Sequence, residues 1–132
     1  MKDVRAAAFK FNREDTVSIQ RIESGTHLSK VVIHGDTVYL AGLTANKTLG
    51  QSVTEQTREI LSMIDGYLAQ AGTDKSKLLK ANIWLTDIRT WAEMNAVWNA
   101  WIVPGSPPTR ATVEAKLANT EAKVEIMVEA AK

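Results

Sequence analysis

The order of hydrophobic periods is the feature that most constrains how this chain can fold. Strand patterns, alternating or continuously apolar, occur in six segments, which are residues 17–22, 30–33, 37–40, 78–85, 110–117 and 123–130. Helical spacing of apolar residues occurs in two segments, which are residues 52–71 and 90–101. In chain order these are three strands, a helix, a strand, a helix and two strands. This order predicts an α+β domain with two helices on one face of a mixed sheet.

Capping residues mark the ends of the two helices. Ser52 and Glu55 have the spacing of a capping box, in which each side chain accepts a hydrogen bond from the backbone N–H of the other residue. Thr90 and Glu93 repeat this spacing at the start of the second helix. Gly72 is predicted to end the first helix, because glycine readily adopts the left-handed conformation of a helix end.

Tryptophans are concentrated in the second half of the chain. Trp91, Trp98 and Trp101 lie on the apolar stripe of the second helix, and core packing is favoured over a stacking platform for bases. Trp84 lies in the mostly buried strand predicted at residues 78–85, and core packing is favoured over a position at the border of the ligand. His27 is predicted to be a surface residue in the loop before the second strand.

The last two strands are predicted to form a hairpin through the short link at residues 118–121. With the turn centred on residues 119 and 120, Arg110 opposes Glu129, and Glu114 opposes Glu125. The period of two then places six side chains on the face that the helices leave open, namely Arg110, Thr112, Glu114, Glu125, Met127 and Glu129. The simplest interpretation is a solvated face with cross-strand ion pairs, which contribute little stability.

The first hairpin argues for an additional cover on the open face. Its arms, residues 30–33 and 37–40, are apolar or nearly so on both sides. Strands that are apolar on both faces are normally covered on both faces. Because the two helices cover only one side, the other cover is predicted to be another subunit. A homo-oligomer with polar residues at its subunit boundaries is therefore expected, and small ligands often bind at such boundaries.

Composition excludes several classes of function. The length of 132 residues fits one domain, and residues 1–15 form an N-terminal extension without a clean period. The chain has no cysteine and two histidines, which excludes disulfides, thiolate catalysis and a histidine-rich metal site. A net charge of +1 gives no electrostatic reason to expect nucleic acid or an acidic membrane as a partner. No apolar stretch is long enough for a membrane span or a signal peptide, so a cytoplasmic protein is predicted.

Several motifs resemble those of one family. They are residues 107–117 (PPTRATVEAKL), 124–126 (VEI), 40–42 (LAG), 56–61 (QTREIL), 83–87 (IWLTD) and 93–98 (EMNAVW). In this order and spacing they resemble the Rid family, also called the YjgF or reactive intermediate deaminase family and often labelled endoribonuclease L-PSP. The resemblance covers about residues 17–131. The domain assignment that follows is an extension at residues 1–15 and a RidA-like domain at residues 16–132.

The resemblance implies a fold, an assembly and an activity. The implied fold is chorismate-mutase-like, and the implied assembly is a homotrimer with clefts between neighbouring subunits. Enzymatically active members hydrolyse reactive enamines and imines, such as 2-aminoacrylate, to 2-oxo acids and ammonia. The implied partner is therefore a small-molecule carboxylate, either an imine or enamine or a 2-oxo acid. The resemblance implies no metal and no cofactor.

Site residues carry over one by one from the resemblance. Arg110 falls on the arginine that holds the substrate carboxylate, and a planar guanidinium can grip a carboxylate with two parallel hydrogen bonds. Glu125 falls on the acidic residue that orients or activates the attacking water, and is the catalytic candidate. Asn95 falls on the asparagine of the second helix. In the hairpin register, Arg110 and Glu125 share a face but lie roughly 13 Å apart along a strand.

Three positions depart from the family pattern. Thr112 stands where many members have cysteine, Ala41 stands where the best-known branch has serine, and Leu43 stands where that branch has glutamine. With Arg110 and Asn95, Ala41 and Thr112 make up the predicted substrate-binding set. The departures indicate a divergent branch with a bulkier or more apolar substrate, and leave open that hydrolysis has been lost.

Two other functions are weighed against a deaminase. The alternative is a non-catalytic ligand-binding or regulatory protein that keeps the cleft and Arg110. A ribonuclease or translation inhibitor, as the older family label suggests, ranks lowest. No His–His or His–Lys pair is evident for acid–base cleavage of RNA, and the net charge gives little attraction for phosphate.

Overall fold

A computed structural model describes residues 18–132, so the predicted extension at residues 1–15 lies outside the described residues. The elements, in chain order, are β1 (Ile19–Ser24), β2 (Ser29–His34), β3 (Thr37–Leu40), α2 (Val53–Gln70), the 3₁₀ turn η1 (Lys75–Lys77), β4 (Leu78–Leu85), the 3₁₀ turn η2 (Ile88–Thr90), α3 (Trp91–Trp101), β5 (Thr109–Glu114) and β6 (Val124–Ala131). The strands form one six-stranded sheet in the order β1-β2-β3-β6-β4-β5.

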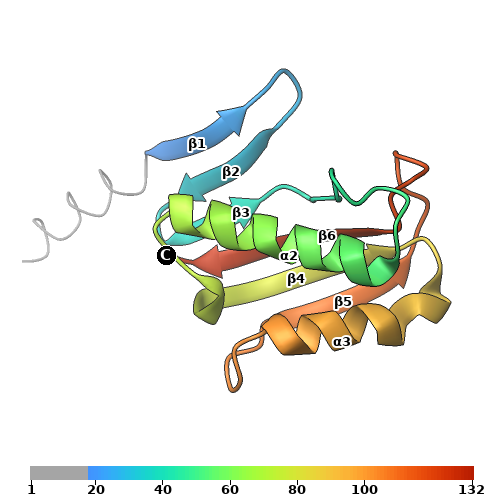
Figure 1. Cartoon of the computed structure of the whole chain (residues 1–132). Coiled ribbons are helices and arrows are strands. Elements are labelled where there is room, and N and C mark those ends of the chain that lie inside the picture. Colours follow the sequence, from blue (N-terminus) through green and yellow to red (C-terminus); the bar gives the residue numbers. More distant parts are fainter. Residues whose placement is uncertain (1–17) are drawn as a thin grey trace, which may run out of the picture.

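The predicted α+β class is confirmed. Both helices lie on the same face of the sheet and leave the other face open (Figure 1). The sheet is mixed, because β4 and β5 run parallel while the other neighbouring strands are antiparallel. The order of strands and helices along residues 18–132 is the one predicted. The first strand begins two residues later than the start predicted at residue 17, and no described helix has the length and apolar character needed to cross a bilayer.

The predicted hairpin between the last two strands is wrong. β6 inserts between β3 and β4 and pairs antiparallel with both, and β5 lies beyond β4 at the edge of the sheet. The reason lies in α3, which connects β4 to β5 as a helical crossover, and such a connection makes the two strands parallel. β6 alternates fully buried and half-buried residues along its whole length, as a central strand does.

This topology changes the faces on which the polar residues lie. In the β4–β5 ladder, Arg110 pairs with Ala81, and Thr112 pairs with Ile83. Ala81 and Ile83 are buried under the helices, so Arg110 and Thr112 also point to the helix-bearing side. Glu125 pairs with Trp84, at the opposite parity of β4, and faces the open side. The predicted cross-strand pairs of Arg110 with Glu129 and of Glu114 with Glu125 do not exist, because β4 lies between β5 and β6.

The core forms between the helices and the inner face of the sheet. Its largest fully buried apolar side chains are Leu43, Ile60, Ile64, Leu68, Ile83, Leu85, Met94 and Ile126. The end of α2 follows the prediction. Gly72 has φ of 83°, its N–H donates to Ala69 O, and the Thr73 N–H donates to Leu68 O, which together form a Schellman motif.

Of the two predicted capping boxes, only part of the first is present. Ser52 Oγ accepts a hydrogen bond from the Glu55 N–H at 3.2 Å, as expected for an N-cap. At α3 the prediction is wrong, since Thr90 makes no side-chain cap. Glu93 instead reaches α2, where its Oε2 accepts from the N–H and the hydroxyl of Thr54 at 3.0 and 2.9 Å. A carboxylate of α3 therefore caps the start of α2 and ties the two helices together.

Gln56 is a fully buried polar side chain that ties α2 to the start of β6. Its Nε2 donates to the carbonyl oxygens of Gln51 and Glu121 at 3.1 and 3.0 Å, and its Oε1 accepts from the Lys123 N–H at 2.9 Å. Every strong hydrogen-bonding group of the amide is used. The amide thereby fixes the backbone two residues before Glu125, and so contributes to the position of that carboxylate.

We expect Gln56→Glu to lower the free energy of unfolding by about 2–3 kcal/mol, because the amide donor that serves two carbonyls is lost. Urea unfolding measures this change. Gln70→Glu, at an exposed position at the end of the same helix, is the control and should change stability by less than about 0.5 kcal/mol. Equal effects of the two variants would contradict the role given to Gln56.

The Glu59 carboxylate organises the loop that follows β3. It accepts hydrogen bonds from the backbone N–H groups of Asn46, Lys47 and Thr48 and from the Thr48 hydroxyl, at 2.7 to 3.1 Å. Burial by itself raises the pKa of Glu59, but the hydrogen bonds from Lys47, Thr48 and Asn46 outweigh it and lower the pKa from 4.5 to about 2.

This pKa shift predicts a pH-dependent contribution to stability. The pKa is lower in the folded than in the unfolded state, so the stabilisation is fully present above pH 4.5 and is lost as pH falls through about 2. Glu59→Gln should destabilise the protein by roughly 1–3 kcal/mol at pH 7, and the difference from wild type should shrink steadily below pH 4.5. Urea unfolding at several pH values tests this, and a pH-independent difference would refute the assignment.

Candidate active site

Arg110 lies on the helix-bearing side of β5, against three side chains of α3. Its Nη1 donates a hydrogen bond to Asn95 Oδ1 at 2.8 Å. Its Cζ lies 5.3 Å from the ring centroid of Trp98 and 5.7 Å from that of Trp91, which are cation–π distances. Positions 91, 95 and 98 follow the i, i+4, i+7 spacing, so one face of α3 supplies all three contacts.

The Arg110 guanidinium is half-buried and has no anionic partner among residues 18–132. The two ion pairs of these residues join Arg58 to Glu55 and Arg89 to Asp87. Burial lowers the pKa of Arg110 from its ordinary value, although arginine stays protonated at neutral pH. A partly desolvated cation without a counter-ion is stabilised by an incoming anion, and the planar fork matches a carboxylate best.

Thr112 places a second unused polar group on the same side of β5. It lies two residues beyond Arg110, and two residues span roughly 7 Å of strand. Its Oγ1 is buried and has no hydrogen-bond partner among the described residues. Leaving a buried hydroxyl unpaired costs free energy. A ligand bound at Arg110 could therefore be stabilised by a hydrogen bond from this hydroxyl.

Glu125 lies on the open face, where the loop after β3 meets β6. Its carboxylate occupies the space that a side chain at position 42 would need, because a Cβ added to Gly42 would overlap Oε2 and lie 3.2 Å from Cδ. Leu43 and Ile126 exchange backbone hydrogen bonds of 2.9 and 3.0 Å, which hold the loop against β6. Neither of the ion pairs within residues 18–132 involves Glu125.

The predicted site residues thus form two groups on opposite faces of the sheet. One group is Arg110, Asn95 and Thr112, and the other is Glu125 with the loop at Ala41. Position 110 lies two strands from β6, which is roughly 10 Å across the sheet, and it is level with Val128. Glu125 lies three residues from Val128, which is roughly 10 Å along β6. One chain alone therefore does not bring Arg110 and Glu125 onto one small molecule.

The departures at positions 41 and 43 differ in their consequences. Ala41 is half-buried and precedes the glycine that accommodates Glu125, and its N–H donates to Lys30 O at 2.9 Å. Leu43 is only 1% exposed and belongs to the core. The interpretation of Leu43 as a change in the cleft is therefore wrong for this chain.

The tryptophan predictions hold only in part. Trp98 is core, as predicted, but Trp91 is 43% exposed and Trp84 lies half-buried on the open face. His27 is exposed, as predicted. The stacking of the indoles on Arg110 was not predicted. A detectable signal was present, because Trp91, Asn95 and Trp98 share one helix face and an aromatic pair flanking an amide can receive a guanidinium.

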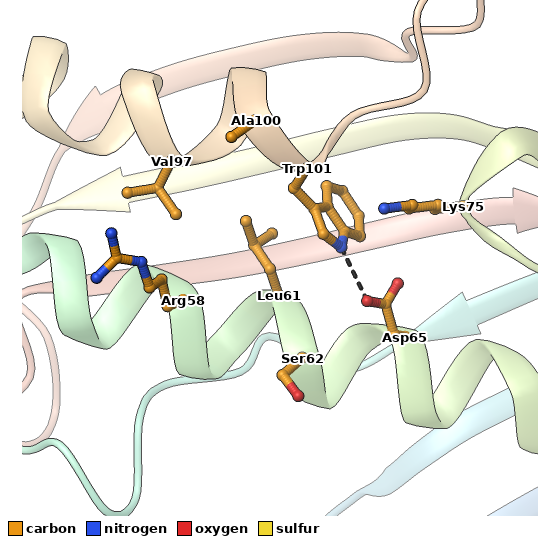
Figure 2. A pocket seen from close by; sticks show the side chains of 8 residues that line it. All are labelled: Arg58, Leu61, Ser62, Asp65, Lys75, Val97, Ala100 and Trp101. Atoms are coloured by element: carbon orange, nitrogen blue, oxygen red, sulfur yellow. Dashed lines mark hydrogen bonds between the residues drawn. The ribbon is translucent and has the colours of Figure 1, made fainter.

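A separate groove runs between α2 and α3 on the outer side of the helices (Figure 2). It encloses about 290 Å³, and it is lined by Arg58, Leu61, Ser62, Asp65, Lys75, Val97, Ala100 and Trp101. Within it, Trp101 Nε1 donates to Asp65 Oδ2 at 3.0 Å, and the Lys75 ammonium lies 5.2 Å from the Trp101 ring centroid. None of the predicted site residues lines this groove.

Metal ligands are not gathered anywhere in the part of the chain that the structure describes. No three of its histidines, aspartates and glutamates approach one another closely enough to hold an ion.

Comparison with known proteins shows the family. The sequence profile described as Endoribonuclease L-PSP matches residues 18–132. A RutC family protein of Haemophilus influenzae is 46% identical over 112 residues, covering 85% of this chain and 97% of that protein. The RutC family protein YoaB of Escherichia coli is 43% identical over 115 residues, covering 87% of this chain and 99% of that protein.

Solved structures agree with the sequence matches. The crystal structure of NMB1025, a YjgF family protein from Neisseria meningitidis, superimposes with a TM-score of 0.85 at 38% identity, over 89% of this chain and 97% of that one. The chain therefore belongs to the YjgF/RutC family, whose sequence profile is named Endoribonuclease L-PSP.

Proposed function

We propose that this protein is an enamine/imine deaminase that hydrolyses reactive 2-aminoacrylate-type intermediates to 2-oxo acids and ammonia. The observation that carries the proposal is the Arg110 guanidinium, which is half-buried, oriented by Asn95 and without an anionic partner among residues 18–132. A fixed, uncompensated fork of this kind is suited to a carboxylate. The position of Arg110 in the family motif adds support, since it falls on the arginine that holds the substrate carboxylate in active members.

The proposed chemistry needs no nucleophilic side chain. Arg110 binds the substrate carboxylate and so fixes the neighbouring C=N carbon. An imine takes a proton from solvent at its nitrogen, and an enamine takes one at its β-carbon, so both react as the iminium. Glu125 orients a water and accepts its proton as the C–O bond forms at that carbon. The proton on Glu125 then passes to the nitrogen, the C–N bond breaks and ammonia leaves. The hydroxyl group that came from the water gives its proton to Glu125 and becomes the carbonyl of the 2-oxo acid.

This chemistry requires Arg110 and Glu125 to come from different subunits, because within one chain they lie on opposite faces of the sheet. We therefore propose a homotrimer with its clefts between neighbouring subunits, the assembly that the family resemblance implies. The open face supports this, since Val113 is 50% exposed beside its half-buried β4 partner Trp84, and Tyr39 is 40% exposed on β3. Apolar side chains gathered on an open sheet face are typical of a subunit contact.

Ligand binding without hydrolysis is the second candidate, and one observation favours it. The Arg110 group is complete within one chain, whereas Glu125 needs a correctly placed neighbour. A protein that kept the first group and lost the second would bind 2-oxo acids through Arg110 and turn over no imine.

Arg110→Ala should lower kcat/KM for imine hydrolysis about 100-fold or more, because two charge-assisted hydrogen bonds to the substrate are lost. An amino-acid oxidase generates the imine, and semicarbazide traps what escapes hydrolysis. Arg89→Ala, which removes an exposed arginine paired with Asp87, is the matched control and should leave the rate unchanged. A wild-type protein that hydrolyses no imine but binds 2-oxo acids through Arg110 would establish the second candidate instead.

Mixing subunits tests whether the site is shared. Arg110→Ala and Glu125→Gln proteins, each inactive alone, are unfolded together, refolded and assayed. If Arg110 and Glu125 of each site come from different subunits, about one quarter of the sites in a 1:1 mixture regain both residues. Activity should then return to about a quarter of wild type. No recovery in mixtures that have demonstrably exchanged subunits would place both residues of each site in one chain.

Gly42→Ala should displace the Glu125 carboxylate without unfolding the protein, because the atom in the way is the far end of a flexible side chain. We expect kcat to fall about tenfold or more, with thermal stability nearly unchanged. Gly66→Ala is the matched control, since a Cβ there meets nothing within 4 Å; it should leave activity unchanged and raise helix stability slightly. A fully active Gly42→Ala protein would argue against a role for the carboxylate at this position.

A further inference from the structure

Trp91 exposes an indole beside the proposed carboxylate site. It is the first residue of α3, it is 43% exposed, and its ring centroid lies 5.7 Å from Arg110 Cζ. The packing of α3 does not depend on it, because Met94 and Trp98 supply the buried face of this helix. A large apolar ring therefore stands in solvent next to an unpaired cation, where a ligand of Arg110 would meet it.

The two indoles around Arg110 have different surroundings. Trp98 is 4% exposed and packs against Trp101, with the two ring centroids 5.4 Å apart. It is therefore a buried contact of Arg110. Trp91 has no such aromatic neighbour among the described residues and remains accessible. Of the two rings, Trp91 is the one that a bound molecule can touch.

The geometry of carboxylate binding places the substrate side chain near Trp91. In a forked pair, the carboxylate carbon lies about 4 Å from the guanidinium carbon. The side chain of a 2-imino acid begins two bonds beyond that carboxylate carbon. An indole centred 5.7 Å from the same guanidinium carbon is therefore within van der Waals reach of side chains longer than a methyl group.

Charged groups near the start of α3 are already engaged. The Glu93 carboxylate accepts two hydrogen bonds from Thr54, and Glu114 Oε1 accepts from the Ile88 N–H at 3.0 Å. Arg89 pairs with Asp87. Lys80 lines the same small pocket as Arg110, but it neighbours buried Ala81 on β4 and so points to the open face, on the other side of the sheet from Trp91. An acidic substrate side chain directed at Trp91 would therefore meet no cation there.

We propose that Trp91 is a specificity residue that contacts the substrate side chain, and that the substrate class is 2-imino acids with apolar side chains, aromatic or branched aliphatic. This inference rests on the proposed imine hydrolysis, and it narrows the substrate from the small 2-aminoacrylate type to larger apolar members. A flat indole beside the carboxylate site favours such side chains through burial of apolar surface and ring contacts.

The test compares imines made by an amino-acid oxidase from leucine, phenylalanine, alanine and glutamate. Wild type should prefer the leucine and phenylalanine imines over the alanine imine about tenfold or more in kcat/KM, and should act on the glutamate imine least. Trp91→Ala should abolish this preference, because the leucine and phenylalanine rates fall by a larger factor than the alanine rate. Trp91→Phe should retain most of it. Ile88→Ala, which removes a similarly exposed side chain (41%) three residues away, is the control and should change neither rate.

Binding supplies a readout that needs no turnover. The change in tryptophan fluorescence on titration with 4-methyl-2-oxopentanoate or pyruvate reports affinity for the unreactive products. Tighter binding of 4-methyl-2-oxopentanoate than of pyruvate, if it is lost in Trp91→Ala, supports the inference. This holds even if the protein hydrolyses no imine, because missing hydrolysis refutes only the proposed reaction. Hydrolysis without the apolar preference, or with a preference that survives Trp91→Ala, refutes the inference and leaves the proposed reaction standing. A protein that neither hydrolyses imines nor binds these acids contradicts both.

Discussion

The insertion of β6 between β3 and β4 is the constraint on which the rest of the structure depends. β6 supplies alternating buried residues to the core, and it hydrogen-bonds to a strand on each side. Its position leaves β5 as an edge strand, parallel to β4 and adjacent to α3. The same arrangement puts Arg110 under the helices and Glu125 on the open face, so the sheet topology determines how any active site can be assembled.

The Arg110 guanidinium without an anionic partner is the second physical constraint on the site. The surroundings of Arg110 orient it through Asn95 and two indoles, yet none of the described groups neutralises its charge. Glu125 is accommodated by the missing side chain of Gly42. Each group alone is a binding feature, and the proposed hydrolysis needs both. The proposed function therefore depends on the proposed trimer.

Much of the fold could be predicted from the sequence, because the periods of two and 3.6 are clear in residues 52–71 and 123–130. The pairing of strands could not, since the short link at 118–121 favours a hairpin and only the crossover through α3 forbids it. The face of Arg110 followed from that pairing and was wrong for the same reason. Arg110 and Glu125 could be named from the family motifs, whereas the indoles around Arg110 depend on how α3 docks on β5. Tertiary packing also directs the Glu93 carboxylate to Thr54 of α2, and not to the start of its own helix as predicted.

The central claim is that one substrate is held by Arg110 of one subunit and Glu125 of another. A crystal structure with 4-methyl-2-oxopentanoate bound tests it most directly. The account predicts a ligand carboxylate on the Arg110 guanidinium, with the Glu125 carboxylate of a neighbouring subunit directed at the ligand carbonyl carbon. A ligand that contacts both residues of the same chain, or one bound away from Arg110, would contradict it.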